Sequence, residues 1–166
     1  MKKIISLILA LAVLCSLGVS AFAAGSPTKT TKVEEDVAIP TTDSNGDPCY
    51  AICSLEDDSV IRTIPVDEVS FIPVGQANSL AKEDADAFKA EYKNVKSITD
   101  KTVQSFFWLD IGDNEVNEGE YFKLDFVCKG DDITVTSNGN EMAVVTGSEM
   151  CTAKLTEVGA IAIMTK

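Results

Sequence analysis

The feature that most constrains the fold is the alternation of apolar and polar residues in the C-terminal half of the chain. Over residues 121–128 every second side chain is apolar, and Lys123 and Asp125 lie between them. This period of two is the pattern of an antiparallel strand with one buried face. Residues 102–111 alternate too, with Val103 and Phe107 on one face and Trp108 on the other, so both faces of that strand are expected to be covered.

Short runs of β-forming residues between turn residues predict further strands. They lie at residues 49–55, 59–64, 69–74, 133–136, 141–145, 150–155 and 160–164. Asn138-Gly139 separates two of these runs and is a strong hairpin signal. The last two runs are expected to form a closing hairpin through residues 157–159.

A single amphipathic helix is expected at about residues 79–96, capped by Asn78 or Ser79. Its apolar stripe includes Phe88 and Tyr92, at helical spacing. The predicted fold class is therefore mainly β or α+β, an antiparallel β-sandwich-like domain of about eight short strands with this helix packed on a sheet face.

The first 23 residues have the pattern of a secretory signal peptide. Lys2 and Lys3 precede an apolar run that ends in Ala21-Phe22-Ala23, an A-x-A cleavage site. Small residues in the second half of the run argue against a membrane anchor, and Val13-Leu14 before Cys15 does not fit a lipoprotein signal. We expect a secreted, extracellular protein without a membrane span after signal removal, either released or loosely associated with the cell surface.

The rest of the chain divides near residue 48. Residues 24–48 are rich in Thr, Pro and acidic residues and predict a flexible leader that adds at most a short strand near Val37. Residues 49–166 predict one β-rich domain, expected to be monomeric. Removing residues 1–23 takes away two lysines and changes the net charge from −12 to −14, which argues against nucleic-acid binding.

The chain contains no histidine. Catalysis by Ser-His-Asp or Cys-His groups and every histidine-containing metal site are therefore excluded. Carboxylates are numerous, but no motif places a pair of them for acid–base chemistry. We expect a protein that is not an enzyme and needs no cofactor.

The C-terminal half resembles small secreted proteins of Gram-positive anaerobic bacteria that have an Ig-like or β-rich domain, mostly of unassigned function. The resemblance covers roughly residues 79–166. It lies in residues 106–111, 121–126, 133–136 with Asn138-Gly139, and 153–162. It implies a secreted β-rich domain and assigns no site residues.

Cys49, Cys53, Cys128 and Cys151 remain after signal removal and are candidates for disulfides. On one strand, the Cα atoms of Cys49 and Cys53 would be about 13 Å apart, whereas a disulfide needs about 4.4 to 6.8 Å. Four free, mostly buried thiols are the equal alternative. Their spacing argues against a zinc site.

An acidic stretch after the strand at residues 102–111 is the candidate metal site, with calcium as the ion. A solvated loop explains the same composition. The candidate ligands are Asp110, Asp113, Glu115, Glu118 and Glu120.

The candidate ligand-binding residues are Phe106, Trp108 and Tyr121. Phe106 and Trp108 project from the same side of one strand, as in a sugar-stacking platform. Packing of the same two rings against the Phe88 and Tyr92 stripe is the favoured alternative.

The leading functional hypothesis is an exported, non-catalytic binding module whose partner is a protein or glycan outside the cell. A small extracellular enzyme, or an enzyme inhibitor using the loop at residues 110–120, is the second. The third is a structural domain stabilised by Ca²⁺ or disulfides.

Overall fold

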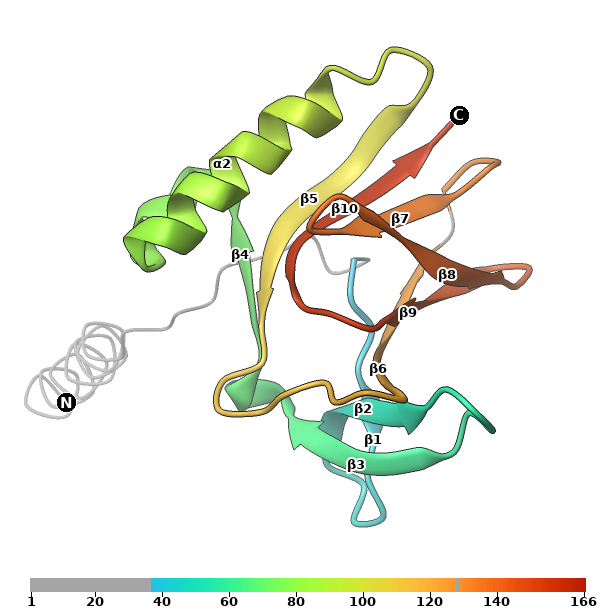
Figure 1. Cartoon of the computed structure of the whole chain (residues 1–166). Coiled ribbons are helices and arrows are strands. Elements are labelled where there is room, and N and C mark those ends of the chain that lie inside the picture. Colours follow the sequence, from blue (N-terminus) through green and yellow to red (C-terminus); the bar gives the residue numbers. More distant parts are fainter. Residues whose placement is uncertain (1–36, 128) are drawn as a thin grey trace, which may run out of the picture. The chain divides into compact units, whose positions relative to one another are not determined.

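The computed structural model describes residues 37–127 and 129–166. In these residues antiparallel strands dominate, and Lys82–Lys96 forms the α-helix α2 (Figure 1). The strands are β1 Thr41–Thr42, β2 Pro48–Ser54, β3 Val60–Pro65, β4 Ser70–Pro73, β5 Thr102–Asp110, β6 Glu120–Val127, β7 Thr134–Ser137, β8 Asn140–Thr146, β9 Met150–Leu155 and β10 Gly159–Thr165. Two 3₁₀-helices complete the fold, η1 Val66–Glu68 and η2 Val74–Ser79.

All ten strands belong to one curled sheet. The order along it is β1-β2-β6-β9-β8-β7-β10-β5-β4, and β3 pairs with the other side of β2. Every pairing is antiparallel. The mainly β, α+β class is thus confirmed, but pairing is continuous through β8 instead of forming two separate sheets.

The expected closing hairpin of the last two strands is wrong. β9 pairs with β6 and β8, whereas β10 pairs with β7 and β5. Every residue of β10 is buried. A strand buried on both faces needs neighbours on both edges, and β10 finds them in β5 and β7. The hairpin at Asn138-Gly139 is confirmed, and both of its turn residues have positive φ angles, 48° and 85°.

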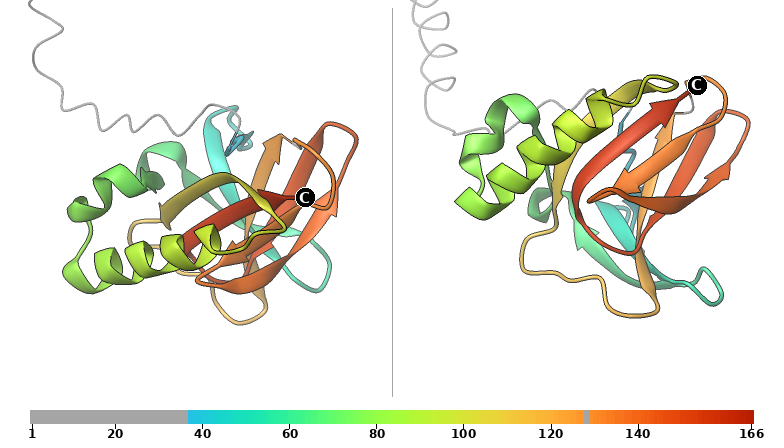
Figure 2. Two further views of the ribbon diagram at one scale, coloured as in Figure 1. Left: turned by 90° about the horizontal axis from the view of Figure 1, so that it is seen from above. Right: turned by 45° about the horizontal axis from the view of Figure 1, so that its top comes forward.

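The core lies inside the curl of the sheet. On β6, Phe122, Leu124 and Phe126 are buried in this core, so the period of two predicted the correct face. On β5, Phe107 and Leu109 point into the same core, whereas Phe106 and Trp108 point to the opposite face. That outer face of β5 and β10 is covered by α2 (Figure 2).

Val103 lies on the outer face with Phe106, not on the core face that strict alternation predicts. The register between β5 and β10 shifts at this point, since Ser105 pairs with Ile163 but Val103 pairs with Met164. An extra residue in one strand is a β-bulge, which changes the face of the residues beyond it. Gln104 is the residue without a counterpart.

The helix begins at Lys82, three residues after the predicted start. Ala81 is the N-cap residue and makes no side-chain cap hydrogen bond. Asn78 and Ser79 belong to η2 instead: the Ser79 hydroxyl donates to the Gln76 carbonyl, and the Asn78 amide oxygen accepts from Lys89. Ser79 thus bonds locally within η2, whereas Asn78 links η2 to the side of α2.

The folded domain begins earlier than residue 49. Val37 packs in the main core, and the Ile39 amide donates to the Asp125 carbonyl at 2.7 Å. Thr41–Thr42 pairs with the start of β2. Residues 37–48, expected in the flexible leader, therefore contribute to the sheet and its core, because Val37 and Ile39 find apolar and backbone partners beside β6. The predicted signal peptide and residues 24–36 lie outside the described residues.

Candidate functional site

The candidate sugar-binding rings form the contact between α2 and the sheet. Phe106 stacks on Phe88 with ring centroids 5.1 Å apart, and Trp108 meets Phe88 edge-on at 5.8 Å. Tyr92 covers Phe106 from the next helical turn at 5.2 Å. The structure therefore places Phe106 and Trp108 against α2, which is the alternative that the sequence favoured over a sugar-binding platform.

Tyr121, the third candidate, is also enclosed: its side chain is 2% exposed, on the outer face of β6. Its hydroxyl donates to Asp58 Oδ1 at 3.0 Å, and Lys154 Nζ lies 2.5 Å from the same oxygen. The lysine also sits 5.1 Å from the Tyr121 ring centroid. Together these contacts fasten the turn between β2 and β3 to β6 and β9.

Asp58 occupies the left-handed region with φ of 59°, which Asp adopts more readily than most residues. Hydrogen bonds from Lys154 and then Tyr121 hold the pKa of its carboxyl below the ordinary value. Burial is the main cause that raises the pKa of Tyr121. Asp58, Tyr121 and Lys154 thus form a hydrogen-bonded cluster that links the β2–β3 turn to β6 and β9.

Among the acidic candidate metal ligands, the side chains of Glu120 and Asp110 have different partners. Glu120 pairs with Arg62 at 2.8 Å, and the Arg62 guanidinium also donates to the Glu115 carbonyl. Asp110 accepts from the Gly112 amide at 3.0 Å. Within residues 37–127 and 129–166, no group of three or more acidic or cysteine side chains is placed to hold a metal ion.

The cysteines differ in state. Cys49 and Cys53 are free, buried thiols on β2, and burial is the main cause that raises the pKa of each. The two do not form a disulfide with each other, as expected for residues on one strand. Cys151 is disulfide-bonded, whereas Cys128 lies outside the described residues.

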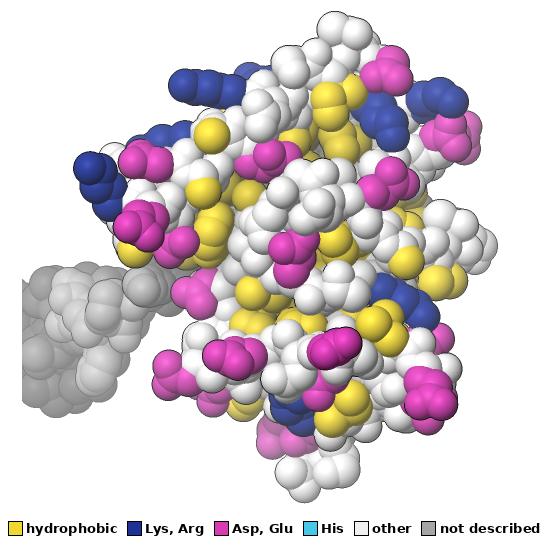
Figure 3. Space-filling model, viewed as in Figure 1, with side chains coloured by type: hydrophobic (Ala, Val, Ile, Leu, Met, Phe, Trp, Pro, Cys, Tyr) yellow, Lys and Arg dark blue, Asp and Glu magenta, His cyan; other side chains and the backbone are white. Residues whose placement is uncertain are grey.

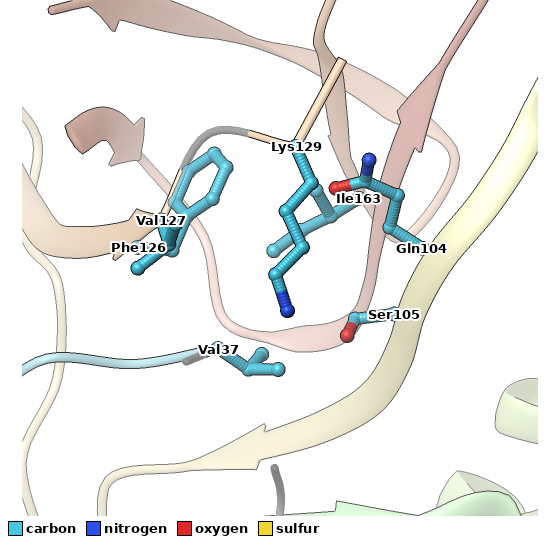
Figure 4. A pocket seen from close by; sticks show the side chains of 7 residues that line it. All are labelled: Val37, Gln104, Ser105, Phe126, Val127, Lys129 and Ile163. Carbon is cyan, nitrogen blue, oxygen red and sulfur yellow. The ribbon is translucent and has the colours of Figure 1, made fainter. Parts of the chain in front are cut away.

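A pocket of about 200 Å³ opens where the ends of three strands meet the N-terminal segment (Figure 4). Its apolar wall consists of Val37, Phe126, Val127 and Ile163. Phe126 and Ile163 belong to the main core, so the pocket reaches the inner face of the sheet. The volume is below the range of roughly 300 to 1,000 Å³ for drug-sized ligands and suits a small molecule or one end of a longer one.

Three polar side chains line the same pocket: Gln104, Ser105 and Lys129. Ser105 reaches the pocket because it shares the core-facing side of β5 with Phe107. Gln104 is the bulged residue next to it in the chain. The Gln104 amide nitrogen donates to Thr165 at 3.4 Å. In Figure 4 the Lys129 ammonium group is directed toward the side of the pocket where Val37 and Ser105 lie.

Sequence reasoning missed all the residues of this pocket. They come from four segments that are far apart in the chain, and only the fold brings them together. One local irregularity was present: Gln104 and Ser105 are consecutive polar residues before the apolar run at 106–109, so strict alternation is broken where the bulge lies.

The pocket can donate several hydrogen bonds. A lysine ammonium has three donors and no acceptor, and a serine hydroxyl adds one donor. A ligand with an apolar body and an acceptor group, above all a carboxylate, matches this arrangement. Lys129 already interacts with another part of the chain, so a ligand would share or replace that interaction.

Acidic side chains are spread over the face of the domain shown in Figure 3, with fewer basic ones between them. Their field opposes the approach of anions at long range. Salt screens charges beyond about 8 Å at physiological ionic strength, so the contact between an ammonium and a carboxylate inside the pocket is affected less. Local donors, more than net charge, decide what this pocket accepts.

No helix among residues 37–127 and 129–166 has the length and apolar character needed to cross a membrane. The chain matches no protein-family model, no curated protein and no solved structure. The resemblance to secreted β-rich proteins of Gram-positive anaerobes therefore stays a prediction.

Proposed function

We propose that the chain is an exported, non-catalytic binding protein whose pocket between β5, β6 and β10 takes a small carboxylate with an apolar body. The observation that supports this most is the combination of Lys129, Ser105 and Gln104 with an apolar wall in one pocket. The N-terminal signal pattern supports export.

The proposal assigns each part of the ligand to a part of the pocket. The carboxylate lies at the mouth, where Lys129 and Ser105 donate to it. The apolar body extends inward along Phe126 and Ile163, and each buried methylene contributes about 0.8 kcal/mol. Specificity for acids then follows, because an alcohol of the same length offers the Lys129 ammonium no negative charge.

The test compares two five-carbon probes, pentanoate and pentanol, by isothermal titration calorimetry on the purified protein. Pentanoate is expected to bind saturably, and pentanol at least tenfold more weakly. Lys129→Gln removes a charge-assisted hydrogen bond, which contributes about 1.5 to 3 kcal/mol when well formed. Lys129 is exposed, so a loss of about tenfold, the lower end of that range, is expected.

Lys82→Gln is the matched control, because it removes the same charge from an exposed position at the start of α2. Its pentanoate affinity should stay within about twofold of the unchanged protein. Equal losses in the two variants would show that only net charge matters and would reject the pocket. Absence of saturable pentanoate binding would reject the carboxylate proposal, and a protein partner or a glycan would then become the leading candidate.

A further inference from the structure

A second groove, separate from the pocket of Figure 4, lies between the C-terminal half of α2 and the β7–β8 hairpin. Its volume is about 330 Å³, within the range of small-molecule sites. Val95 from α2 and Met164 from β10 form its apolar floor, and Ile98, just after the helix, lies at its rim. Hydrophobic side chains are visible at the surface between α2 and this hairpin in Figure 3.

Thr136 on β7 contributes a hydroxyl that is shielded from solvent and has no hydrogen-bond partner. Among the buried side-chain nitrogen and oxygen atoms of the described residues, it is the only one in this condition. An unpaired buried hydroxyl costs free energy, and in a native protein it calls for an explanation such as a bound molecule. This one lines the groove.

Glu91 brings a carboxylate into the same groove. One carboxylate oxygen accepts from the Asn94 amide at 3.2 Å. The group also lies over the hairpin turn, since a Cβ atom at Gly139 would be 3.4 Å from both of its oxygens. The Glu91 carboxylate therefore lies between the last turns of α2 and the hairpin turn.

A second acidic residue is paired with Thr136 in the sheet. Glu141 on β8 is directly opposite Thr136 in the β7–β8 ladder, and residues paired in this way project from the same face of a sheet. Ala162 is the partner of Thr136 on β10 and packs with Val95 under α2. Thr136 thus shares a sheet face with Glu141 and with the apolar residues under α2.

We propose that this groove binds a primary alkylammonium ion, a small organic cation with an aliphatic chain. The ammonium group donates to the Glu91 carboxylate, and it reaches the Thr136 oxygen once that side chain turns its hydroxyl into the groove. The aliphatic chain lies on Val95, Ile98 and Met164. The net negative charge of the protein attracts cations to this groove, and the site is independent of the carboxylate pocket.

Binding is tested by recording backbone amide shifts of the purified, isotope-labelled protein in NMR titrations with pentylammonium. The expected result is saturable shifts at Val95, Ile98 and Gly139. Pentanol should bind at least tenfold more weakly, because it provides no charge for Glu91. Shifts that centre elsewhere, equal binding of pentanol, or no saturable change would overturn the proposal and leave ordered water as the occupant.

Two conservative variants locate the site. Glu91→Gln keeps the size of the side chain and should weaken pentylammonium binding about tenfold, the loss expected for one charge-assisted hydrogen bond. Thr136→Val removes the orphan hydroxyl at nearly constant volume. It should weaken binding severalfold without lowering the urea midpoint, because the hydroxyl has no partner to lose.

Glu83→Gln, at an exposed position in the first turn of α2, is the matched control and should leave binding within about twofold. Lys129→Gln should likewise leave pentylammonium binding unchanged, and Glu91→Gln should leave pentanoate binding unchanged. Failure of one site is thereby distinguished from failure of the other. Equal effects of Glu83→Gln and Glu91→Gln would refute a specific contact with Glu91.

Discussion

Replacing Phe88 by alanine is expected to destabilise the domain by about 2 to 4 kcal/mol. Truncation of a buried phenylalanine costs about 3 to 5 kcal/mol, and the Phe88 ring has no exposed surface. That range already includes the ring contacts with Phe106 and Trp108, each of which contributes about 0.5 to 1.5 kcal/mol. The higher helix propensity of alanine returns up to about 0.7 kcal/mol, which lowers the expected loss to about 2 to 4 kcal/mol.

Urea unfolding followed by tryptophan fluorescence and circular dichroism measures this change. With a slope of about 1 to 3 kcal/mol per molar urea, the midpoint should fall by about 1 to 4 M. Trp108 is the single tryptophan, so its emission reports directly on the interface. Loss of the Phe88 edge contact should expose the indole and shift the folded-state emission to longer wavelength.

Lys93→Ala is the control, since this side chain is exposed on the same helix and should change the stability by about 0.5 kcal/mol or less. Phe88→Leu should fall between the two variants, because it keeps part of the buried volume. The reasoning would be refuted by a Phe88→Ala protein with the midpoint and emission of the control. In that case α2 would not be packed on Phe106 and Trp108, and the sugar platform would return as a candidate.

Two further predictions concern the turns of the sheet. The folded-state pKa of Asp58 is lowered, chiefly by the hydrogen bond from Lys154, so its contribution to stability is present above the ordinary pKa of about 3.9 and is lost as the pH falls through the folded value. The difference in urea midpoint between the unchanged protein and Asp58→Asn should therefore shrink from pH 7 to pH 3, and a constant difference would contradict the contact. Gly159→Ala should destabilise by more than about 1 kcal/mol, because φ is +133° and the new Cβ would lie 2.4 Å from the Asn138 amide oxygen. Gly75→Ala, where nothing lies within 4 Å, is its control, and equal thermal midpoints for the two would show that the backbone at Gly159 adapts.

The alternation of side chains predicted most of the strands and the core face of β6. It failed for Val103, because strict alternation assumes that no residue is inserted, and the bulge at Gln104 moves Val103 to the other face. Hairpin turns were predictable only where a local signal exists. Asn138-Gly139 has one. After β9 the chain instead crosses past β8 and β7 to form β10, and no local residue pattern predicts this connection.

The candidate sites were less predictable than the fold. Phe106, Trp108 and Tyr121 were chosen for their ring chemistry, and the structure places all three in internal contacts. Lys129 was not predicted as a site residue, because a single lysine after a strand has the same sequence pattern as any surface lysine. Its significance comes from Ser105 and Val37, which lie far away in the sequence.

The sequence by itself determined the β-rich class, the amphipathic helix, the acidic charge and the exclusion of histidine chemistry. These properties depend on composition and on local periodicity, which follow from backbone geometry. Tertiary structure alone decided the order of the strands, the role of Val37 in the core, and the two cavities on either side of the sheet. Pairing partners and cavities depend on contacts between segments that are distant in the chain, and such contacts are set by how all the apolar faces are buried together.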